Sequence, residues 1–219
     1  SYPVLDIKGA LESLVTVKDF IRWIVSACNE HAVVLGHGYD DVWDEAVMLV
    51  LYALHLPHDI DTRVQDTRLT ENEKRRVLEL VQQRVIDRVP TAYLIKQAWF
   101  AGLPFAVDDR VLIPRSPIGE LIEKHFEPWV KPESVEAILD LCTGSACIGI
   151  ACAHYFPEAI VDCVDISEDA LDVAERNLQA HGMEGRVNLI YSDLFEALEG
   201  RTYDIIVSNP PYVDEQDMP

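Results

Sequence analysis

The chain has 219 residues, of which 49% are hydrophobic, so it can bury a sizeable core as one large domain or two small ones. Its net charge of −20 is concentrated in the second part: residues 1–95 hold 15 acidic and 10 basic side chains, and residues 96–219 hold 23 and 8. Because binding to phosphates needs a basic surface, this composition argues against a nucleic-acid partner and is compatible with a basic protein partner.

The first ninety residues are predicted to be helical, because apolar side chains recur there at spacings of three and four. Asp41 is a predicted N-cap, and the helix that follows it is expected to end at Leu56, before a proline. A further helix is expected from Thr70, which opens a capping box, to about Arg88. The pattern therefore predicts a helical module over residues 1–92.

A β-hairpin is predicted next, over residues 93–114, because short apolar stretches there are broken by turn residues. From Ser116 onward, predicted helices and strands alternate. Four strands are expected at residues 137–142, 160–165, 187–191 and 203–208, with helices from about Cys147 and Ser167 between them. Such alternation builds a parallel sheet with helices on both faces. The predicted fold class is α/β, a Rossmann-like doubly wound parallel sheet, with a small helical amino-terminal domain.

The first candidate site is a turn of small residues around Gly144, between a predicted strand and a predicted helix. Asp165 ends the next strand, 21 residues after Gly144, where an acidic side chain can accept hydrogen bonds from ribose hydroxyls. The turn lacks the G-x-G-x-x-G pattern of a pyrophosphate-binding loop, so we expect a nucleoside cofactor without phosphates. Taken alone, the motif also fits a tight turn in an ordinary α/β protein.

The second candidate site is the segment from Asn209 to Tyr212, which follows the fourth predicted strand at the carboxyl edge of the sheet. Methylation of an amide or an exocyclic amine requires its weakly nucleophilic nitrogen to be aimed at the methyl carbon of a sulfonium. The Asn209 side-chain oxygen and the Pro210 carbonyl can accept the two N–H bonds, and the Pro-Pro segment is rigid. Tyr212 can stack on the planar group. We interpret Asn209, Pro210 and Tyr212 as catalytic residues rather than as a simple Asn-Pro loop.

These motifs resemble those of the N5-glutamine methyltransferases, which share the Asn-Pro-Pro-Tyr segment and a helical amino-terminal domain. Further matching motifs lie at residues 88–93, 99–104, 112–115, 140–145 and 192–195. The sequence of residues 114–121 is similar to that of the family branch that methylates a glutamine of the third large-subunit ribosomal protein. The resemblance covers nearly the whole chain, although the family continues through further strands beyond Pro219.

The resemblance implies S-adenosyl-L-methionine as the cofactor, N5-methylation of a protein glutamine as the reaction, and no metal. The residues that match the family's cofactor site are Cys142, Thr143, Gly144, Ser145, Ala146, Asp165, Ile166, Asp193, Leu194 and Asn209. Those that match its substrate site are Phe100, Asn209, Pro210, Pro211 and Tyr212. The implied organisation is a helical substrate-recognition domain at 1–92, a hairpin linker at 93–114 and an incomplete cofactor-binding methyltransferase domain at 115–219. Cys142 and Ala146 replace glycines common in the family, which is expected to tighten or shift the cofactor loop.

Two other functions remain open from the sequence. A nucleic-acid amino-methyltransferase would also use an Asn-Pro-Pro-Tyr segment, to hold an adenine or guanine amine, although the acidic second part opposes it. A non-catalytic cofactor-binding module is the other possibility, motivated by the missing strands and the replaced glycines.

No membrane or secretory segment is predicted. The longest apolar run, residues 46–54, is nine residues long, about half of a bilayer span. The first residues lack the basic and apolar regions of a signal peptide, so we expect a cytoplasmic protein. The seven histidines lack metal-ligand spacing, and the five cysteines, an odd number without a C-x-x-C pair, are expected to be reduced core residues.

Overall fold

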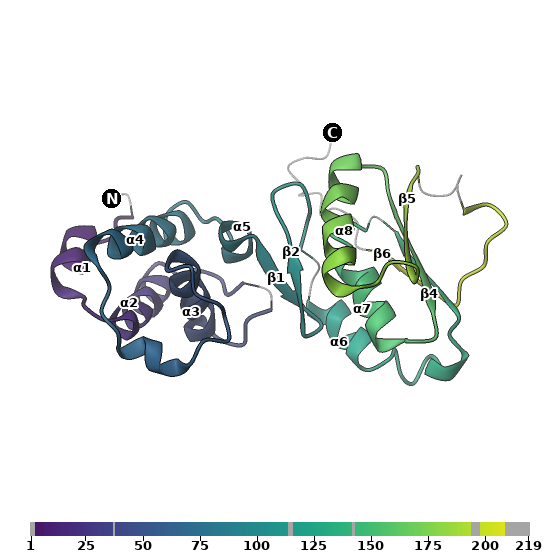
Figure 1. The fold of residues 1–219 in the computed structure, drawn as a ribbon, viewed down its shortest axis with the longest axis horizontal. Coiled ribbons are helices and arrows are strands. Elements are labelled where there is room, and N and C mark those ends of the chain that lie inside the picture. Colours follow the sequence, from purple (N-terminus) through teal and green to yellow (C-terminus); the bar gives the residue numbers. More distant parts are fainter. Residues whose placement is uncertain (1–2, 37, 114–115, 142, 194–197, 209–219) are drawn as a thin grey trace. The chain divides into compact units, whose positions relative to one another are not determined.

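The computed structural model describes residues 3–36, 38–113, 116–141, 143–193 and 198–208, with the backbone alone at Ser116. The chain divides into two compact units, Ser1–Lys96 and Gln97–Pro219. Figure 1 shows the first as an assembly of helices and the second as a sheet with helices. Each unit has a hydrophobic core of its own.

The first unit is helical, as predicted. Its elements are α1 (Ile7–Ser13), α2 (Val17–Glu30), α3 (Val42–Ala53), a 3-10 helix (Thr62–Asp66), α4 (Glu71–Val85) and α5 (Thr91–Ile95). The predicted caps are confirmed: Asp41 accepts a hydrogen bond from the third residue of α3, and Thr70 forms a capping box with Glu73. Each such cap satisfies backbone N–H groups that the helix leaves without a partner. The buried faces of α2, α3 and α4 supply most of this unit's core.

Two predicted helix ends in this unit are wrong. Helix α3 ends at Ala53 rather than Leu56, because His55 adopts a left-handed conformation with φ of 58° and the Leu56 N–H donates to the Leu51 carbonyl at 2.9 Å. Helix α4 ends at Val85 rather than Arg88. In both cases the chain leaves the helix before the proline that we took as the stop signal, because the last carbonyls are already satisfied by a turn. Helices α1 and α5 were not predicted.

The second unit begins with the predicted hairpin. Strands β1 (Gln97–Phe100) and β2 (Leu103–Ala106) pair antiparallel, with Phe100 opposite Leu103. The two-residue loop between them, Ala101 and Gly102, has φ values of 49° and 76°. Two successive positive φ values are typical of a type I′ turn, whose twist matches that of the paired strands.

The rest of the second unit alternates helix and strand. Its elements are α6 (Ser116–Glu123), a 3-10 helix (Pro132–Ser134), β3 (Ala137–Leu141), α7 (Cys147–Tyr155), β4 (Ile160–Asp165), α8 (Glu168–His181), β5 (Val187–Tyr191) and β6 (Ile205–Ser208). The four strands form one parallel sheet in the order β5-β4-β3-β6. This is the α/β class that the alternation predicted. The strand order reverses between β3 and β6, which makes their carboxyl ends the switch point of the sheet.

The two faces of the sheet carry different cores. Helices α6, α7 and α8 pack with Ile138, Val161 and Cys163 on one face, in the larger cluster. The opposite face carries a smaller cluster around Leu139, Val164 and Leu198. The larger cluster therefore fixes α7 and α8 against the strands whose ends form the candidate site.

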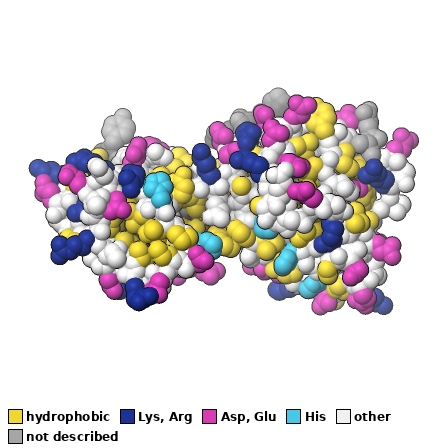
Figure 2. Space-filling model, viewed as in Figure 1, with side chains coloured by type: hydrophobic (Ala, Val, Ile, Leu, Met, Phe, Trp, Pro, Cys, Tyr) yellow, Lys and Arg dark blue, Asp and Glu magenta, His cyan; other side chains and the backbone are white. Residues whose placement is uncertain are grey.

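Charged side chains are interspersed on the visible surface. On the face drawn in Figure 2, Lys and Arg side chains are separated by acidic and uncharged ones and form no continuous basic stripe. Within the described ranges, no helix combines the length and the apolar character that crossing a membrane requires.

Candidate active site

The turn after β3 is the centre of the predicted cofactor site. Gly144 and Ala146 both adopt left-handed backbone conformations, with φ of 55° and 66°. This conformation costs a non-glycine residue about 1–2 kcal/mol, so Ala146 takes up a geometry that a glycine would adopt without strain. Ala146 is also the N-cap of α7, which has no side-chain cap hydrogen bond. The turn therefore runs directly into a helix end that carries partial positive charge.

The carboxyl group of Asp140, on β3, holds this turn from the inside of the unit. Its Oδ2 atom accepts hydrogen bonds from the Thr143 hydroxyl at 2.6 Å and from the Gly149 N–H at 3.0 Å, and the Cys163 thiol lies 3.8 Å away. Its Oδ1 atom is buried and has no hydrogen-bond partner among the described residues. Desolvation raises the pKa of Asp140 to about 7, although the hydrogen bonds from Thr143 and Gly149 oppose that rise. A neutral carboxyl is therefore accessible here near neutral pH.

The cysteines near this carboxyl are free and buried. Cys147, Cys152 and Cys163 all lie in the core of the second unit, and Cys28 is free and buried in the first. Burial raises the pKa of the Cys147 thiol to about 12, so this group stays neutral. These four cysteines are core residues, as expected, and Cys142 lies outside the described residues.

Asp165, at the end of β4, contacts the turn directly. Its Oδ2 atom accepts a hydrogen bond from the Gly144 N–H at 2.9 Å, and its Oδ1 atom accepts one from the Ser167 N–H at 2.9 Å. Each carboxylate oxygen can accept a second hydrogen bond, and the residue is only half-buried. Asp165 therefore keeps capacity for ligand hydroxyl groups. The next residue, Ile166, is 64% exposed and presents an apolar side chain.

The ends of the other two strands meet the same edge. The Ser192 N–H, after β5, donates to the Asp165 carbonyl at 3.1 Å, and the exposed Asp193 follows it. Ser208, the last residue of β6, pairs with Leu141 of β3. The structure thus brings together Thr143, Gly144, Ser145, Ala146, Asp165 and Asp193. The predicted site residues Cys142, Leu194, Asn209, Pro210, Pro211 and Tyr212 lie outside the described residues.

Phe100 of the hairpin is buried, with 3% of its surface exposed. A Cβ atom added to Gly119 of α6 would lie 3.2 Å from the Phe100 ring, so the ring packs closely on this helix. In the described structure Phe100 is therefore part of the core that joins the hairpin to α6.

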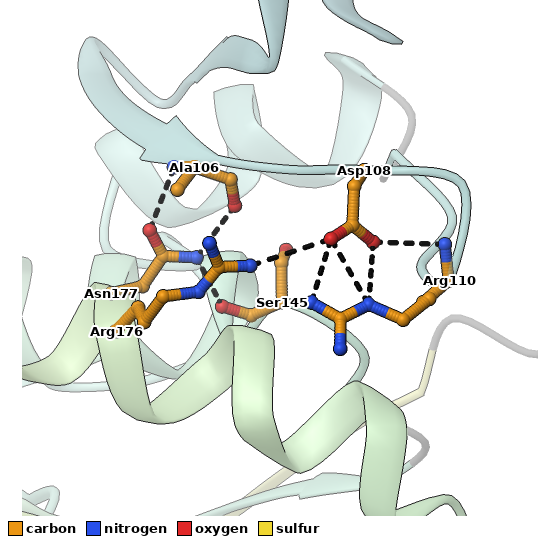
Figure 3. Close-up of polar contacts among 6 residues, drawn as sticks. All are labelled: Ala106, Asp108, Arg110, Ser145, Arg176 and Asn177. Atoms are coloured by element: carbon orange, nitrogen blue, oxygen red, sulfur yellow. Dashed lines mark hydrogen bonds and ion pairs between the residues drawn. The ribbon is translucent and has the colours of Figure 1, made fainter.

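Asn177, on α8, is a residue that sequence reasoning missed. Its side chain bonds both Ala106 of the hairpin and Ser145 of the glycine turn, as Figure 3 shows. The signal that could have found it is its position. Ala170, Val173, Ala174 and Leu178 form the buried face of α8, and an asparagine at the same helical spacing is a polar residue at a core position.

The chain is similar in sequence to known methyltransferases. The Methyltransferase small domain family matches residues 123–218. The ribosomal protein uL3 glutamine methyltransferase of Francisella tularensis is 50% identical over 209 residues, which are 95% of this chain and 67% of that protein. That of Bordetella pertussis is 50% identical over 208 residues, which are 94% of this chain and 70% of that protein.

Among solved structures, the human methyltransferase 10 domain containing protein aligns with a TM-score of 0.43 and 18% identity, over 51% of this chain and 55% of that one. The aligned regions of the two curated relatives include residues of both the helical unit and the methyltransferase unit. The chain therefore belongs to the family of ribosomal protein uL3 glutamine methyltransferases.

Proposed function

We propose that this protein transfers a methyl group from S-adenosyl-L-methionine to the side-chain nitrogen of a glutamine in ribosomal protein uL3. The observation that carries the proposal is the contact between the Gly144 turn and Asp165 at the carboxyl edge of the sheet, beside the switch point between β3 and β6. Sheets of this order bind ligands at that place. The names of the two curated relatives support the substrate.

The described residues fit a nucleoside cofactor. Asp165 has lone pairs left for ribose hydroxyls, Ile166 offers an exposed apolar surface, and Asp193 stands at the neighbouring strand end. Gly144 supplies the left-handed backbone conformation that this tight turn requires. When bound, S-adenosyl-L-methionine supplies an electrophilic methyl group on a sulfonium.

The Asn-Pro-Pro-Tyr segment follows β6 directly in the chain, and we assign substrate binding to it. The Asn209 side-chain oxygen and the Pro210 carbonyl accept the two N–H bonds of the glutamine amide, which directs the nitrogen lone pair at the methyl carbon. As the N–C bond forms, the S–C bond breaks and the nitrogen loses one proton to water. Pro211 stiffens the segment, and Tyr212 is assigned to the wall that excludes water. The family resemblance also assigns Phe100 to this wall, although its ring is buried against Gly119 of α6.

We further propose that residues 1–92 recognise the protein substrate and that residues 93–114 link them to the methyltransferase domain. The excess of acidic side chains, 15 against 10 in residues 1–95 and 23 against 8 in the rest, supports a basic partner. Ribosomal proteins are basic and are assembled in the cytoplasm, which is where we place the reaction.

The deciding experiment is transfer of labelled methyl from S-adenosyl-L-methionine into purified uL3, followed by mass spectrometry of the labelled peptide. Asn209→Ala should lower the transfer rate by roughly 10²-fold, as expected for removal of one positioned polar group from an active site. Gln179→Ala is the control, because Gln179 is exposed on α8, outside residues 1–92 and outside the candidate site, and should leave the rate unchanged. Near-normal transfer by Asn209→Ala would contradict the assignment.

Assays with different substrates distinguish the proposed function from the two other functions. A uL3 variant with glutamate in place of the labelled glutamine should accept no methyl group, because it offers no nitrogen. Label in RNA or DNA instead of uL3 would identify a nucleic-acid amino-methyltransferase. Calorimetric binding of S-adenosylhomocysteine without transfer to either substrate would identify a non-catalytic binding module.

A further inference from the structure

The Asn177 carboxamide joins three pieces of the second unit. Its Oδ1 atom accepts a hydrogen bond from the Ala106 N–H at 2.7 Å. Its Nδ2 atom donates to the Ala106 carbonyl at 2.9 Å and to the Ser145 carbonyl at 2.8 Å. The three contacts, drawn in Figure 3, therefore connect α8, the end of β2 and the glycine turn through one side chain.

Asparagine is an unfavourable choice at this position for stability alone. Asn177 is 1% exposed and lies in the middle of α8, where asparagine has a lower helix propensity than alanine or leucine. A buried amide is tolerated when its hydrogen bonds are made, and here both donors and one acceptor position are used. The backbone groups around it also fix its orientation, since a flipped amide would set its oxygen against two carbonyls. A residue that breaks a local rule in this way points to a role beyond packing.

Two neighbouring side chains on α8 contact the hairpin segment but do not connect it to the glycine turn. His181, one turn further along α8, bonds the Pro104 carbonyl at 2.6 Å and lies against the Phe105 ring, so it holds the hairpin and not the turn. Arg176 reaches Asp108 at 3.3 Å, but its side chain is 56% exposed, and an exposed ion pair of this kind contributes little. Asn177 is buried and bonds both pieces.

The segment between β2 and α6 makes the spacing of these pieces relevant to the site. A Cβ atom added to Gly144 would lie 3.8 Å from the Val111 Cβ atom and 3.9 Å from the Leu112 carbonyl. The chain that continues from Ala106 therefore passes over the glycine turn. A shift of Ala106 relative to Ser145 would move this cover with respect to the cofactor turn.

We propose that Asn177 is a positioning residue for methyl transfer: it holds the glycine turn and the hairpin at one fixed spacing, so that the cofactor turn is preorganised. The inference rests on the proposed function for its catalytic consequence. The positions of residues 103–112 and 143–146 can be tested by hydrogen exchange and ligand binding, without an assay of methyl transfer. Asn177→Ala should raise hydrogen exchange at residues 103–107 and 143–146 together and weaken S-adenosylhomocysteine binding about tenfold, with kcat lowered by roughly 10²-fold, the loss associated with small misplacements.

Two variants on the same helix serve as matched controls. His181→Ala should raise exchange in the hairpin and leave the affinity for S-adenosylhomocysteine unchanged, because His181 does not bond the turn. Gln179→Ala removes an exposed side chain two residues from Asn177 and should change neither. A second variant covers the case in which Asn177→Ala fails to fold. Asn177→Asp keeps the acceptor for the Ala106 N–H and regains one donor only when its carboxyl is protonated, so its affinity relative to the natural protein should rise as the pH falls from about 8 to about 6.

The outcomes separate this inference from the proposed function. Exchange in the turn that stays normal in Asn177→Ala, or a relative affinity of Asn177→Asp that does not depend on pH, would overturn the positioning role. Absence of methyl transfer to uL3 by the natural protein would instead overturn the proposed substrate, while the exchange and S-adenosylhomocysteine measurements on the full 219-residue chain would still decide the role of Asn177.

Discussion

Two carboxyl groups buried among the described residues, Glu45 in the helical unit and Asp140 in the methyltransferase unit, are balanced in opposite ways. Glu45, in the helical unit, pairs with the buried Arg84 at 2.8 Å and also accepts hydrogen bonds from the Thr91 hydroxyl at 2.6 Å and the Gly36 N–H at 3.1 Å. Arg84 in turn donates to the Val34 carbonyl at 2.6 Å. Asp140, in the methyltransferase unit, has no cation beside it, and one of its oxygens has no partner within the described ranges.

The different partners of Glu45 and Asp140 indicate different roles for the two buried carboxyl groups. A buried carboxylate that has a cation and further hydrogen bonds fixes the helices and the loop that supply its partners. A buried carboxyl without a cation is shifted toward its neutral form by desolvation, so its charge is sensitive to pH and to ligands that bind near the glycine turn. Glu45 thus stabilises the arrangement of the helices, whereas Asp140 lies near the end of the strand that leads to the cofactor site.

The largest expected effect is the loss of the ion pair in the helical unit. Glu45→Ala should lower the free energy of unfolding by about 3–5 kcal/mol, because it leaves the Arg84 guanidinium buried without a counterion. Urea denaturation measures this loss. Glu71→Ala, which removes the exposed pair between Glu71 and Arg75, is the control and should cost no more than about 0.5 kcal/mol. Similar losses in the two variants would mean that burial does not distinguish these pairs.

A second effect, distinguished by its pH dependence, is expected for Asp140→Asn. The pKa of Asp140 in the folded protein is raised to about 7 from an ordinary value of 3.8. The stabilisation that this shift gives is complete below about pH 4 and is lost as the pH rises through about 7, by roughly 1.4 kcal/mol for each pKa unit. Asparagine does not titrate, so the stability of the natural protein relative to Asp140→Asn should fall over that interval. Urea unfolding of both proteins at several pH values measures this difference. A difference in the free energy of unfolding that stays constant with pH would contradict the raised pKa of Asp140.

The smallest effect is expected at the surface. Hydrogen bonds from the Arg110 side chain, at 2.7, 3.0 and 3.1 Å, hold the pKa of Asp108 down at about 2. A lowered pKa gives a stabilisation that is present above about pH 4 and is lost as the pH falls toward 2. Because the partner cations are partly exposed, Asp108→Asn should lower the free energy of unfolding by less than about 1 kcal/mol at neutral pH. The difference in melting temperature should shrink further in high salt. A loss as large as that of Glu45→Ala would show that this ion pair acts as a buried one.

Local signals predicted the fold better than they predicted the contacts. The capping residues Asp41 and Thr70 and the strands at 137–141, 160–165 and 187–191 are readable because short-range chemistry determines them. The helix ends at Ala53 and Val85 were missed, since the sequence signal was the next proline and the stop is a turn that precedes it.

The candidate site was predicted through the same kind of local pattern. Gly144 and Asp165 were expected to lie in one site, and the structure joins them by a hydrogen bond of 2.9 Å. Asn177 was missed because its three bonds connect residues 32 and 71 positions away, and no local pattern specifies such partners. The depth of Phe100 in the core was missed for the same reason, since its neighbour Gly119 belongs to another element.

The strand order has a consequence for how the protein emerges during translation. Strands β3, β4 and β5 follow one another along the chain and are neighbours in the sheet, whereas β6 returns to pair with β3, with Ile205 opposite Ile138. A nascent chain that has reached Tyr191 already contains both partners of the bond between Gly144 and Asp165. The strand that leads into Asn209 is made afterwards and must insert beside β3, by a pairing that is distant in sequence and therefore slow. The glycine turn and Asp165 can thus be brought together before the Asn-Pro-Pro-Tyr segment exists.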